Sequence, residues 1–409
     1  MKILFVQPTG DKQGHYGIYT THVCQELSRQ GEEVILFTNK IHTKKYISEK
    51  PLFKIFEFKK GKYSFGRFDQ LRKKVPLIYV YGYLRGSFVA IREMIKFIRK
   101  NKIDLIFVMD TEYAILSFLI RFFGKKLPPL VLMVQAANFS FKKFSGHFLF
   151  KIYKVFQRKI FRTAIARRKI KGFVVLGEFH KEELRKQLGL GSDFPIKVIY
   201  DGANPPKKFL NKTSSRKKLD INYDKFIFLF FGMLRKDKGI ECLLKAIALL
   251  RKEEFKLIIA GSLFEYKKKE IERLISELKI KDKVILRLEY IDDKMVPFYF
   301  FSSDVVVFPY KKNYTGGSGP LLKEAAIYKK PVIASNVSEM GRLVEKYQMG
   351  FTFKSEDASN LANRMKRFLS LPEKKREILA NNSSSAANTW KKMAKEYSRF
   401  FKTILNETD

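Results

Sequence analysis

The fold of this chain is decided by the stretch Asp304-Val-Val-Val-Phe-Pro-Tyr310 and by the segment Thr315-Gly-Gly-Ser-Gly-Pro-Leu-Leu-Lys-Glu324 that follows it. The apolar run predicts a buried strand, the glycines predict a tight turn, and the last residues predict the start of a helix. The free N–H groups and the positive dipole end of a helix start bind phosphate and other anions. Glu324, one turn inside the helix, is a candidate acceptor for hydroxyls such as those of a ribose. The alternative is an ordinary helix entrance of an α/β fold.

Strands and helices alternate in two series along the chain. We expect strands at Ile3–Gln7, Glu33–Thr38, Leu105–Met109, Leu130–Gln135, Gly172–Leu176 and Ile196–Tyr200, and then at Phe226–Phe231, Lys256–Ala260, Val284–Leu288, Val305–Phe308 and Pro331–Ala334. This alternation predicts an α/β fold with parallel sheets and right-handed crossovers. In open sheets of this kind ligands bind beyond the carboxyl ends of the strands.

A polar, turn-rich run begins at Asp201 and separates the two series. The length of 409 residues suits two domains better than one. We therefore expect an N-terminal domain over residues 1–203 and a C-terminal domain over residues 204–386. Residues 387–409, which contain the single tryptophan Trp390, are predicted to form a helix that crosses back onto the first domain.

The chain is strongly basic, with 81 Lys and Arg against 41 Asp and Glu and a formal charge of +40. Such an excess indicates a polyanionic partner. It is concentrated in residues 113–177, which contain 14 Lys or Arg and no Asp or Glu.

Within this segment one predicted helix has two opposite faces. Lys151, Lys154, Arg158 and Arg162 share the basic face, and Leu149, Ile152, Tyr153, Phe156 and Ile160 share the apolar face. Such a helix either lies in the domain, with its apolar side in the core and its basic side in water, or binds an anionic membrane surface. Nucleic acid is a third partner that its charge would suit.

Two classes of protein are disfavoured. The apolar run at the start is too short for a signal peptide, and no run reaches the ~18 residues of a membrane span. We therefore expect a cytoplasmic protein, peripheral on the inner face of the cell membrane. Cys24 and Cys242 are too few for a disulfide framework or a cysteine metal cluster, and are expected to be reduced core residues.

A second post-strand loop, Gly232-Met-Leu-Arg-Lys-Asp-Lys-Gly239, places Arg235 and Lys238 at a strand end. Two cations there can clamp a diphosphate, and the Gly316–Pro320 turn offers amides to the same oxygens. Together with Glu324 they predict a nucleotide-diphosphate pocket, against the alternative of a solvated basic loop. A metal site at Asp110-Thr-Glu112 is the less favoured option, because both acids can equally cap the next helix.

The second half resembles the donor domain of glycosyltransferase family 4, retaining enzymes of the GT-B fold. The resemblance rests on Phe231-Gly-Met-Leu-Arg-Lys-Asp-Lys-Gly239, Ile258-Ile-Ala-Gly-Ser262, Ser303-Asp-Val-Val-Val-Phe-Pro-Tyr310, Ser318-Gly-Pro-Leu-Leu-Lys-Glu-Ala325 and Lys330-Pro-Val-Ile-Ala-Ser335. The first half agrees more loosely, through Gln7-Pro, Gly14-His-Tyr-Gly17, Gly31-Glu-Glu-Val-Ile-Leu-Phe-Thr38 and Val198-Ile-Tyr-Asp-Gly202. The resemblance implies two Rossmann-like domains that face a cleft.

The same resemblance implies roles for individual residues. Arg235, Lys238 and Glu324 would be the catalytic set, with the two cations on the donor diphosphate and the carboxylate on the ribose. Donor-binding positions would be Gly14, His15, Gly232, Gly317, Ser318, Gly319, Pro320 and Leu321. The sequence departs from the family at Gly316, where a second glutamate is frequent, and at Gln135, where a histidine is common.

These observations predict a retaining glycosyltransferase that moves a sugar from a nucleotide-diphosphate donor to a lipid-linked or polysaccharide acceptor in cell-surface glycan biosynthesis, such as that of lipopolysaccharide. A same-face reaction would need neither a metal nor a cofactor. The alternatives are a basic nucleic-acid-binding protein, for which no recognisable nucleic-acid-binding motif is present, and a non-catalytic scaffold that binds sugar nucleotides.

Overall fold

The computed structural model describes residues 1–8, 15–39, 49–58, 76–109, 111–123, 127–135, 148–167, 170–314 and 324–407. They form two compact units, one of Met1–Tyr200 with Trp390–Asp409 and one of Asp201–Thr389. The sequence placed the domain boundaries after residues 203 and 386; the structure divides the chain after Tyr200 and after Thr389. In the described ranges no helix is long and apolar enough to cross a membrane.

Unit 1 is built on a parallel sheet with the strand order β3-β2-β1-β4-β5-β6-β7. Its strands are β1 (Lys2–Gln7), β2 (Glu33–Thr38), β3 (Lys54–Glu57), β4 (Leu105–Val108), β5 (Leu130–Val134), β6 (Ile170–Val175) and β7 (Ile196–Val198). The edge strand β3 was not predicted. All four of its residues are exposed, so it lacks the apolar run that marks a buried strand.

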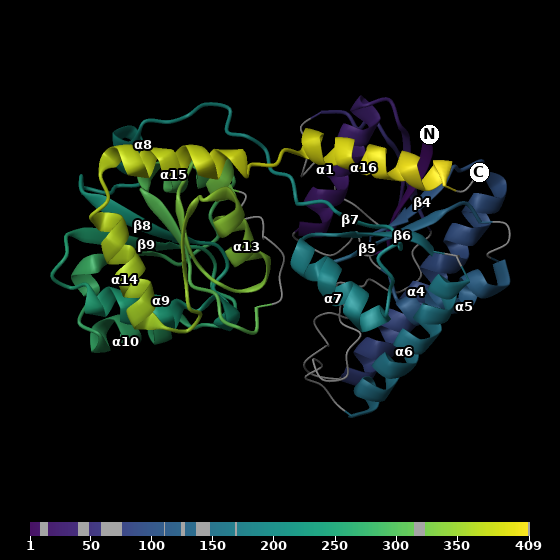
Figure 1. Ribbon diagram of the computed structural model, residues 1–409, viewed down its shortest axis with the longest axis horizontal. Coiled ribbons are helices and arrows are strands. Elements are labelled where there is room, and N and C mark those ends of the chain that lie inside the picture. Colours follow the sequence, from purple (N-terminus) through teal and green to yellow (C-terminus); the bar gives the residue numbers. More distant parts are fainter. Residues whose placement is uncertain are drawn as a thin grey trace. The chain divides into compact units, whose positions relative to one another are not determined.

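Alternate residues of these strands face two different layers of helices, as the period of a strand requires. Leu4 and Val6 of β1 face the layer of α4 (Pro76–Lys100), α5 (Tyr113–Phe123), α6 (Phe148–Ala166) and α7 (Glu178–Leu188). Ile3 and Phe5 face α1 (His15–Arg29) and α16 (Trp390–Asn406). Figure 1 shows the two layers on opposite sides of the sheet of this unit, with α16 in yellow beside α1.

The C-terminal helix α16 is therefore part of the core of unit 1. Tyr397 and Phe401 are fully buried, and both rings contact Phe107 of β4. The hydroxyl oxygens of Tyr397 and Tyr19 lie 2.5 Å apart inside this layer. Trp390, the first residue of the helix, stacks on His22 of α1.

Unit 2 has a second parallel sheet, with the order β10-β9-β8-β11-β12-β13. Its strands are β8 (Phe226–Phe231), β9 (Phe255–Ala260), β10 (Val284–Arg287), β11 (Val305–Phe308), β12 (Val332–Ser335) and β13 (Gly350–Phe353). Its helices are α8 (Lys212–Lys218), α9 (Ile240–Leu249), α10 (Lys268–Glu277), α11 (Val296–Ser302), α13 (Ser338–Tyr347), α14 (Ala358–Leu369) and α15 (Glu373–Ser385). The strand β13 was not predicted.

The strand order of unit 2 reverses between β8 and β11. The chain runs from β8 outward through β9 to β10, and then returns to the other side of β8 with β11. Loops that leave two adjacent strands in opposite directions open a crevice at their carboxyl ends, which is where open α/β sheets bind ligands. In this unit the loops concerned follow Phe231 and Phe308.

Candidate functional site

The loop after β8 is held tightly at both ends by glycines. Gly239 has a φ of +67°, and a Cβ there would lie 1.9 Å from the carbonyl oxygen of Pro309, just after β11. Gly261, after β9, has a φ of +143°, and its Cβ would lie 2.2 Å from the carbonyl oxygen of Gly232. Only glycine allows both the backbone conformation and the close approach. The loop is therefore fixed against the ends of both neighbouring strands.

Within this loop the side chains of Arg235 and Asp237 form a bidentate ion pair. Arg235 donates from Nε to Oδ1 over 3.0 Å and from Nη2 to Oδ2 over 2.7 Å. The carbonyl oxygen of Asp237 also accepts a hydrogen bond of 2.9 Å from the backbone N–H of Lys311 in the loop after β11. The planar guanidinium is thereby oriented, since two parallel bonds fix both its position and its tilt. Its side chain is still 38% exposed and open to a ligand.

Lys238 lies beside Tyr310, one of two buried tyrosines in the loop after β11. Its Nζ is 5.6 Å from the centre of the Tyr310 ring. The rings of Tyr310 and Tyr314 pack edge to face, with their centres 4.5 Å apart. Burial and the neighbouring Arg235 lower the pKa of Lys238 to about 8, while Asp237 and Glu324 oppose this shift. A buried cation next to a second cation costs free energy, which a bound anion would offset.

Glu324 stands in a helical stretch at residues 324–327 and interacts electrostatically with Lys238. Its Oε2 is inaccessible to solvent and has no hydrogen-bond partner in the described part of the chain. Burial, together with Asp293, raises the pKa of Glu324 to about 7, and Lys238 counteracts this. A buried acceptor without a donor is costly, and a ligand hydroxyl would satisfy it.

The structure thus brings together Arg235, Lys238, Glu324 and Gly232 from the predicted site. Asp237, Tyr310 and Tyr314 belong to the same cluster and were not among the predicted site residues. The acid two residues after Arg235 was the available signal for the ion pair. Several predicted positions lie outside the described residues, namely Gly14, Gly317, Ser318, Gly319, Pro320 and Leu321, as do Gly316 and the side chain of His15.

Gln135 follows β5 directly, at the carboxyl edge of the sheet of unit 1. Its Nε2 is inaccessible to solvent and has no hydrogen-bond acceptor among the described residues. The amide therefore leaves an unused donor at the position where the family resemblance would place a histidine.

Glu112 acts as a structural residue. Its Oε2 accepts a hydrogen bond of 2.7 Å from the backbone N–H of Ile115 in the first turn of α5, and its Oε1 accepts one from the side chain of Gln157 in α6. The cap, which was one of the two options for this acid, is the role that the structure shows. Asp110 lies outside the described residues.

The exposure of α6 does not fit the first alternative for this helix, an apolar face in the core and a basic face in water. Lys154 is half-buried and donates from Nζ to Oε1 of Gln157 over 2.9 Å, whereas Ile152 and Phe156 are 50% and 56% exposed. The buried side of the helix instead includes the polar Gln157, whose side chain donates to Oε1 of Glu112. Arg158 is half-buried, Arg162 is exposed, and the side chain of Lys151 is outside the described set.

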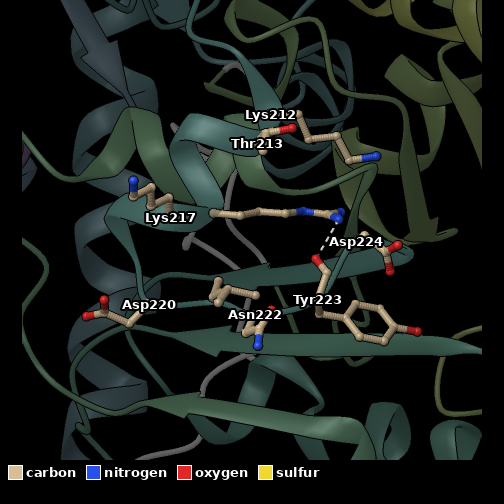
Figure 2. A pocket seen from close by; sticks show the side chains of 9 residues that line it. Lys212, Thr213, Lys217, Asp220, Asn222, Tyr223 and Asp224 are labelled. Atoms are coloured by element: carbon tan, nitrogen blue, oxygen red, sulfur yellow. Dashed lines mark hydrogen bonds between the residues drawn. The ribbon is translucent and has the colours of Figure 1, made fainter.

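A pocket of about 590 Å³ lies elsewhere in unit 2, around α8 and the chain that leads into β8 (Figure 2). Arg216 lines it and donates to the carbonyl oxygens of Tyr223 and Ser302 and to the carboxylate of Asp304. This guanidinium therefore joins three segments of the unit. The pocket lies at the amino end of β8, away from the cluster around Arg235.

Both halves of the chain match known families. Residues 17–206 match the profile described as Glycosyltransferase Family 4, and residues 211–385 match that of Glycosyl transferases group 1. The uncharacterized glycosyltransferase MJ1607 of Methanocaldococcus jannaschii is 28% identical over 51% of this chain and 54% of its own. The capsular polysaccharide biosynthesis glycosyltransferase CapM of Staphylococcus aureus is 25% identical over 52% of this chain and 58% of its own. The chain thus spans little more than half the length of these relatives.

Solved structures share the fold over the whole chain. Sucrose-phosphate synthase of Thermosynechococcus elongatus is 19% identical with a TM-score of 0.74, and the alignment covers 99% of both chains. HepE of Anabaena, solved in complex with UDP, is 18% identical with a TM-score of 0.71, over 98% of this chain and 100% of the other. These likenesses confirm the predicted fold class of two Rossmann-like parallel-sheet domains.

Proposed function

Because this chain belongs to the family 4 and group 1 glycosyltransferases, we propose that it transfers a sugar from a nucleotide-diphosphate donor to an acceptor. The observation that carries the proposal is the cluster of Arg235, Lys238 and Glu324 at the carboxyl ends of β8 and β11, in the half that matches group 1. HepE, whose structures hold UDP and UDP-glucose, supports a nucleotide sugar as the donor.

The cluster suits the chemistry of a departing nucleoside diphosphate. As the bond from the anomeric carbon to the donor oxygen breaks, negative charge grows on the phosphates and positive charge on the sugar. Arg235 is held in place by Asp237 before the reaction, and Lys238 is buried beside the Tyr310 ring, so both can stabilise the growing charge with little reorganisation. Glu324 would accept hydrogen bonds from the ribose hydroxyls, which orients the nucleotide.

We further propose a retaining, same-face reaction without a metal or cofactor. Two cations can compensate the charge of a diphosphate, which a divalent ion does in other enzymes. A donor phosphate oxygen would take the acceptor proton as the acceptor oxygen bonds to the anomeric carbon and the diphosphate leaves.

The proposed acceptor is a lipid-linked or polysaccharide glycan at the inner face of the cell membrane. Two observations support it. CapM, which is named for capsular polysaccharide biosynthesis, matches over about half of this chain. Unit 1 also carries the basic segment of residues 113–177, which suits an anionic surface.

A screen of nucleotide sugars by thermal shift, with and without Mg²⁺, tests the donor class and the metal dependence together. The donor that stabilises the chain is then tested for turnover with Arg235→Ala and with the control Lys312→Ala, an exposed cation of the adjacent loop. We expect turnover in the parent and control, insensitive to chelators, and a severe loss in Arg235→Ala. Donor binding without turnover of any acceptor or of water would indicate a non-catalytic scaffold. Equal rates in all three proteins would show that the diphosphate site lies elsewhere.

A further inference from the structure

Large apolar side chains stand exposed on two neighbouring helices of unit 1. Phe118 and Phe122, one turn apart on α5, are 53% and 64% exposed, and their rings meet edge to face at 5.0 Å. Ile152, Val155 and Phe156 of α6 are likewise exposed. We call these five residues the α5–α6 face. Figure 1 shows α5 and α6 side by side, in the helical layer opposite α1 and α16.

A groove of about 100 Å³ lies between the two helices and joins the two parts of this face. Phe118 and Arg121 line it from α5, and Ile160 and Arg167 line it from the α6 side. Ile160 is one helical turn from Phe156, so the apolar surface continues from Phe122 through the groove and along α6. The two arginines stand at an otherwise largely apolar groove.

The chain segment that forms the α5–α6 face carries basic side chains and no acidic ones. Residues 113–177 contain no Asp or Glu. Arg121, Lys159 and Arg167 are exposed, and the structure describes no ion pair for any of them. Exposed apolar patches usually mark a binding site, and the unpaired cations beside this one favour an anionic partner.

We propose that the α5–α6 face docks on an anionic phospholipid bilayer. The phenylalanine rings and aliphatic side chains enter the boundary of headgroups and acyl chains, and Arg121, Lys159 and Arg167 contact lipid phosphates. A bilayer offers negative charge and apolar depth in one surface. Nucleic acid offers no partner for Ile152 and Val155. The inference rests on the proposed function, because docking on the bilayer would bring the enzyme to a lipid-linked acceptor.

Insertion is measured with introduced tryptophans. Phe118→Trp and Phe156→Trp report on the face, and Phe264→Trp, whose parent side chain is 62% exposed in unit 2, is the matched control. The parent protein supplies the background, because its only tryptophan, Trp390, is buried. With vesicles of phosphatidylcholine and phosphatidylglycerol brominated in the acyl chains, we expect quenching at positions 118 and 156 and none at 264. Absence of quenching at both positions overturns the proposal.

Sedimentation with the same vesicles tests the charges. Arg121→Gln with Lys159→Gln should weaken binding about thirtyfold, as expected for the loss of two cations near an anionic surface. The control pair Lys252→Gln with Lys269→Gln, exposed cations of unit 2, should leave binding unchanged. Equal binding by both double variants overturns the proposal. The proposal is also overturned if the parent protein does not bind vesicles and instead uses this face to bind RNA or to form a concentration-dependent dimer.

Failure of this proposal can be told apart from failure of the proposed function. If vesicle binding is absent but the parent turns over a nucleotide sugar with a soluble acceptor, only the docking surface is wrong. If the face inserts into vesicles but no donor is bound or turned over, the docking stands and the proposed sugar transfer is wrong.

Discussion

Asp237 lies two residues after Arg235 in the same loop, and its carboxylate accepts hydrogen bonds from Nε–H and Nη2–H of Arg235 over 3.0 and 2.7 Å. The same residue is bonded through its carbonyl oxygen to Lys311 after β11. Asp237 thus connects the guanidinium to the neighbouring strand end. In the proposed reaction it would be a positioning residue, because it acts through Arg235.

Replacing Asp237 should change how the donor is bound. We expect Asp237→Ala to lower kcat/KM for the donor about 10- to 100-fold, since a hydrogen bond to a charged group is worth about 1.5–3 kcal/mol. Asp237→Asn keeps one acceptor oxygen and should recover part of the loss. Steady-state kinetics with varied donor, beside thermal unfolding, measure the effect. A parental kcat/KM in Asp237→Ala would contradict the positioning role.

Lys238 should make donor use depend on pH. Its pKa of about 8 means that the cation is lost as the pH rises through that value. We therefore expect kcat/KM, which reports the free enzyme, to fall above about pH 8. Lys238→Ala should lose most of the activity at every pH. Lys238→Arg stays charged, so an alkaline fall that persists unchanged in this variant would assign the titration to another group.

Glu324 should bind the nucleotide as a carboxylate. Because its pKa is raised to about 7, affinity for a nucleoside diphosphate should improve as the pH rises through that value. Glu324→Ala should weaken this affinity about tenfold or more through the lost hydrogen bonds to a charged acceptor. Calorimetric titration of the nucleoside diphosphate measures it. Unchanged affinity would leave Glu324 as an ordinary helix residue.

The raised pKa of Glu324 also predicts how stability depends on pH. The folded state holds this proton more tightly than the unfolded state. The associated stability is fully present below the unfolded pKa and is lost as the pH rises through the folded value of about 7. Glu324→Gln removes this contribution, so the variant should gain stability relative to the parent between pH 5 and pH 8. Chemical denaturation at the two pH values would reveal it, and a pH-independent difference would contradict it.

Gly239 should be the least replaceable residue of the loop after β8. Gly239→Ala combines positive-φ strain, which costs about 1–3 kcal/mol, with a clash against the Pro309 carbonyl. Gly31→Ala is the control for strain alone, because φ is +87° there and nothing lies within 4 Å of the added Cβ. We expect Gly239→Ala to lower Tm more than Gly31→Ala does. Only Gly239→Ala should reduce donor affinity. An equal drop in Tm in both variants would show that the loop shifts to accommodate the added methyl group.

The C-terminal helix should contribute core stability to unit 1. Phe401→Ala removes a fully buried ring that contacts Phe107 and should cost about 3–5 kcal/mol. The control Ile378→Ala, at a side chain that is 51% exposed in α15, should change stability by no more than about 0.5 kcal/mol. Denaturant unfolding of both variants decides it. Similar midpoints would mean that α16 is not needed for unit 1.

The two series of parallel strands could be predicted without the structure, because short apolar runs between turn residues are local signals. The sequence also placed Arg235, Lys238 and Glu324 after strands, and parallel strands bring such positions to one edge of a sheet. Which residues accompany them depends on contacts between segments that are distant in the chain. Nothing local shows that the Tyr310 ring lies beside Lys238 and packs on Tyr314, because both tyrosines come from the loop after another strand.

The same reason explains the elements that the sequence left undecided. Helical spacing grouped the apolar residues of α6 on one face but could not show whether that face is buried. The structure exposes Ile152 and buries Gln157, which hydrogen-bonds Glu112, 45 residues away. The sequence did predict that the C-terminal helix returns to the first domain, but the contacts that place α16 there, such as that between Tyr19 and Tyr397, separated by 378 residues, appear only in the structure. Periodicity shows that a helix has an apolar side, but the partner that buries this side comes from distant parts of the chain.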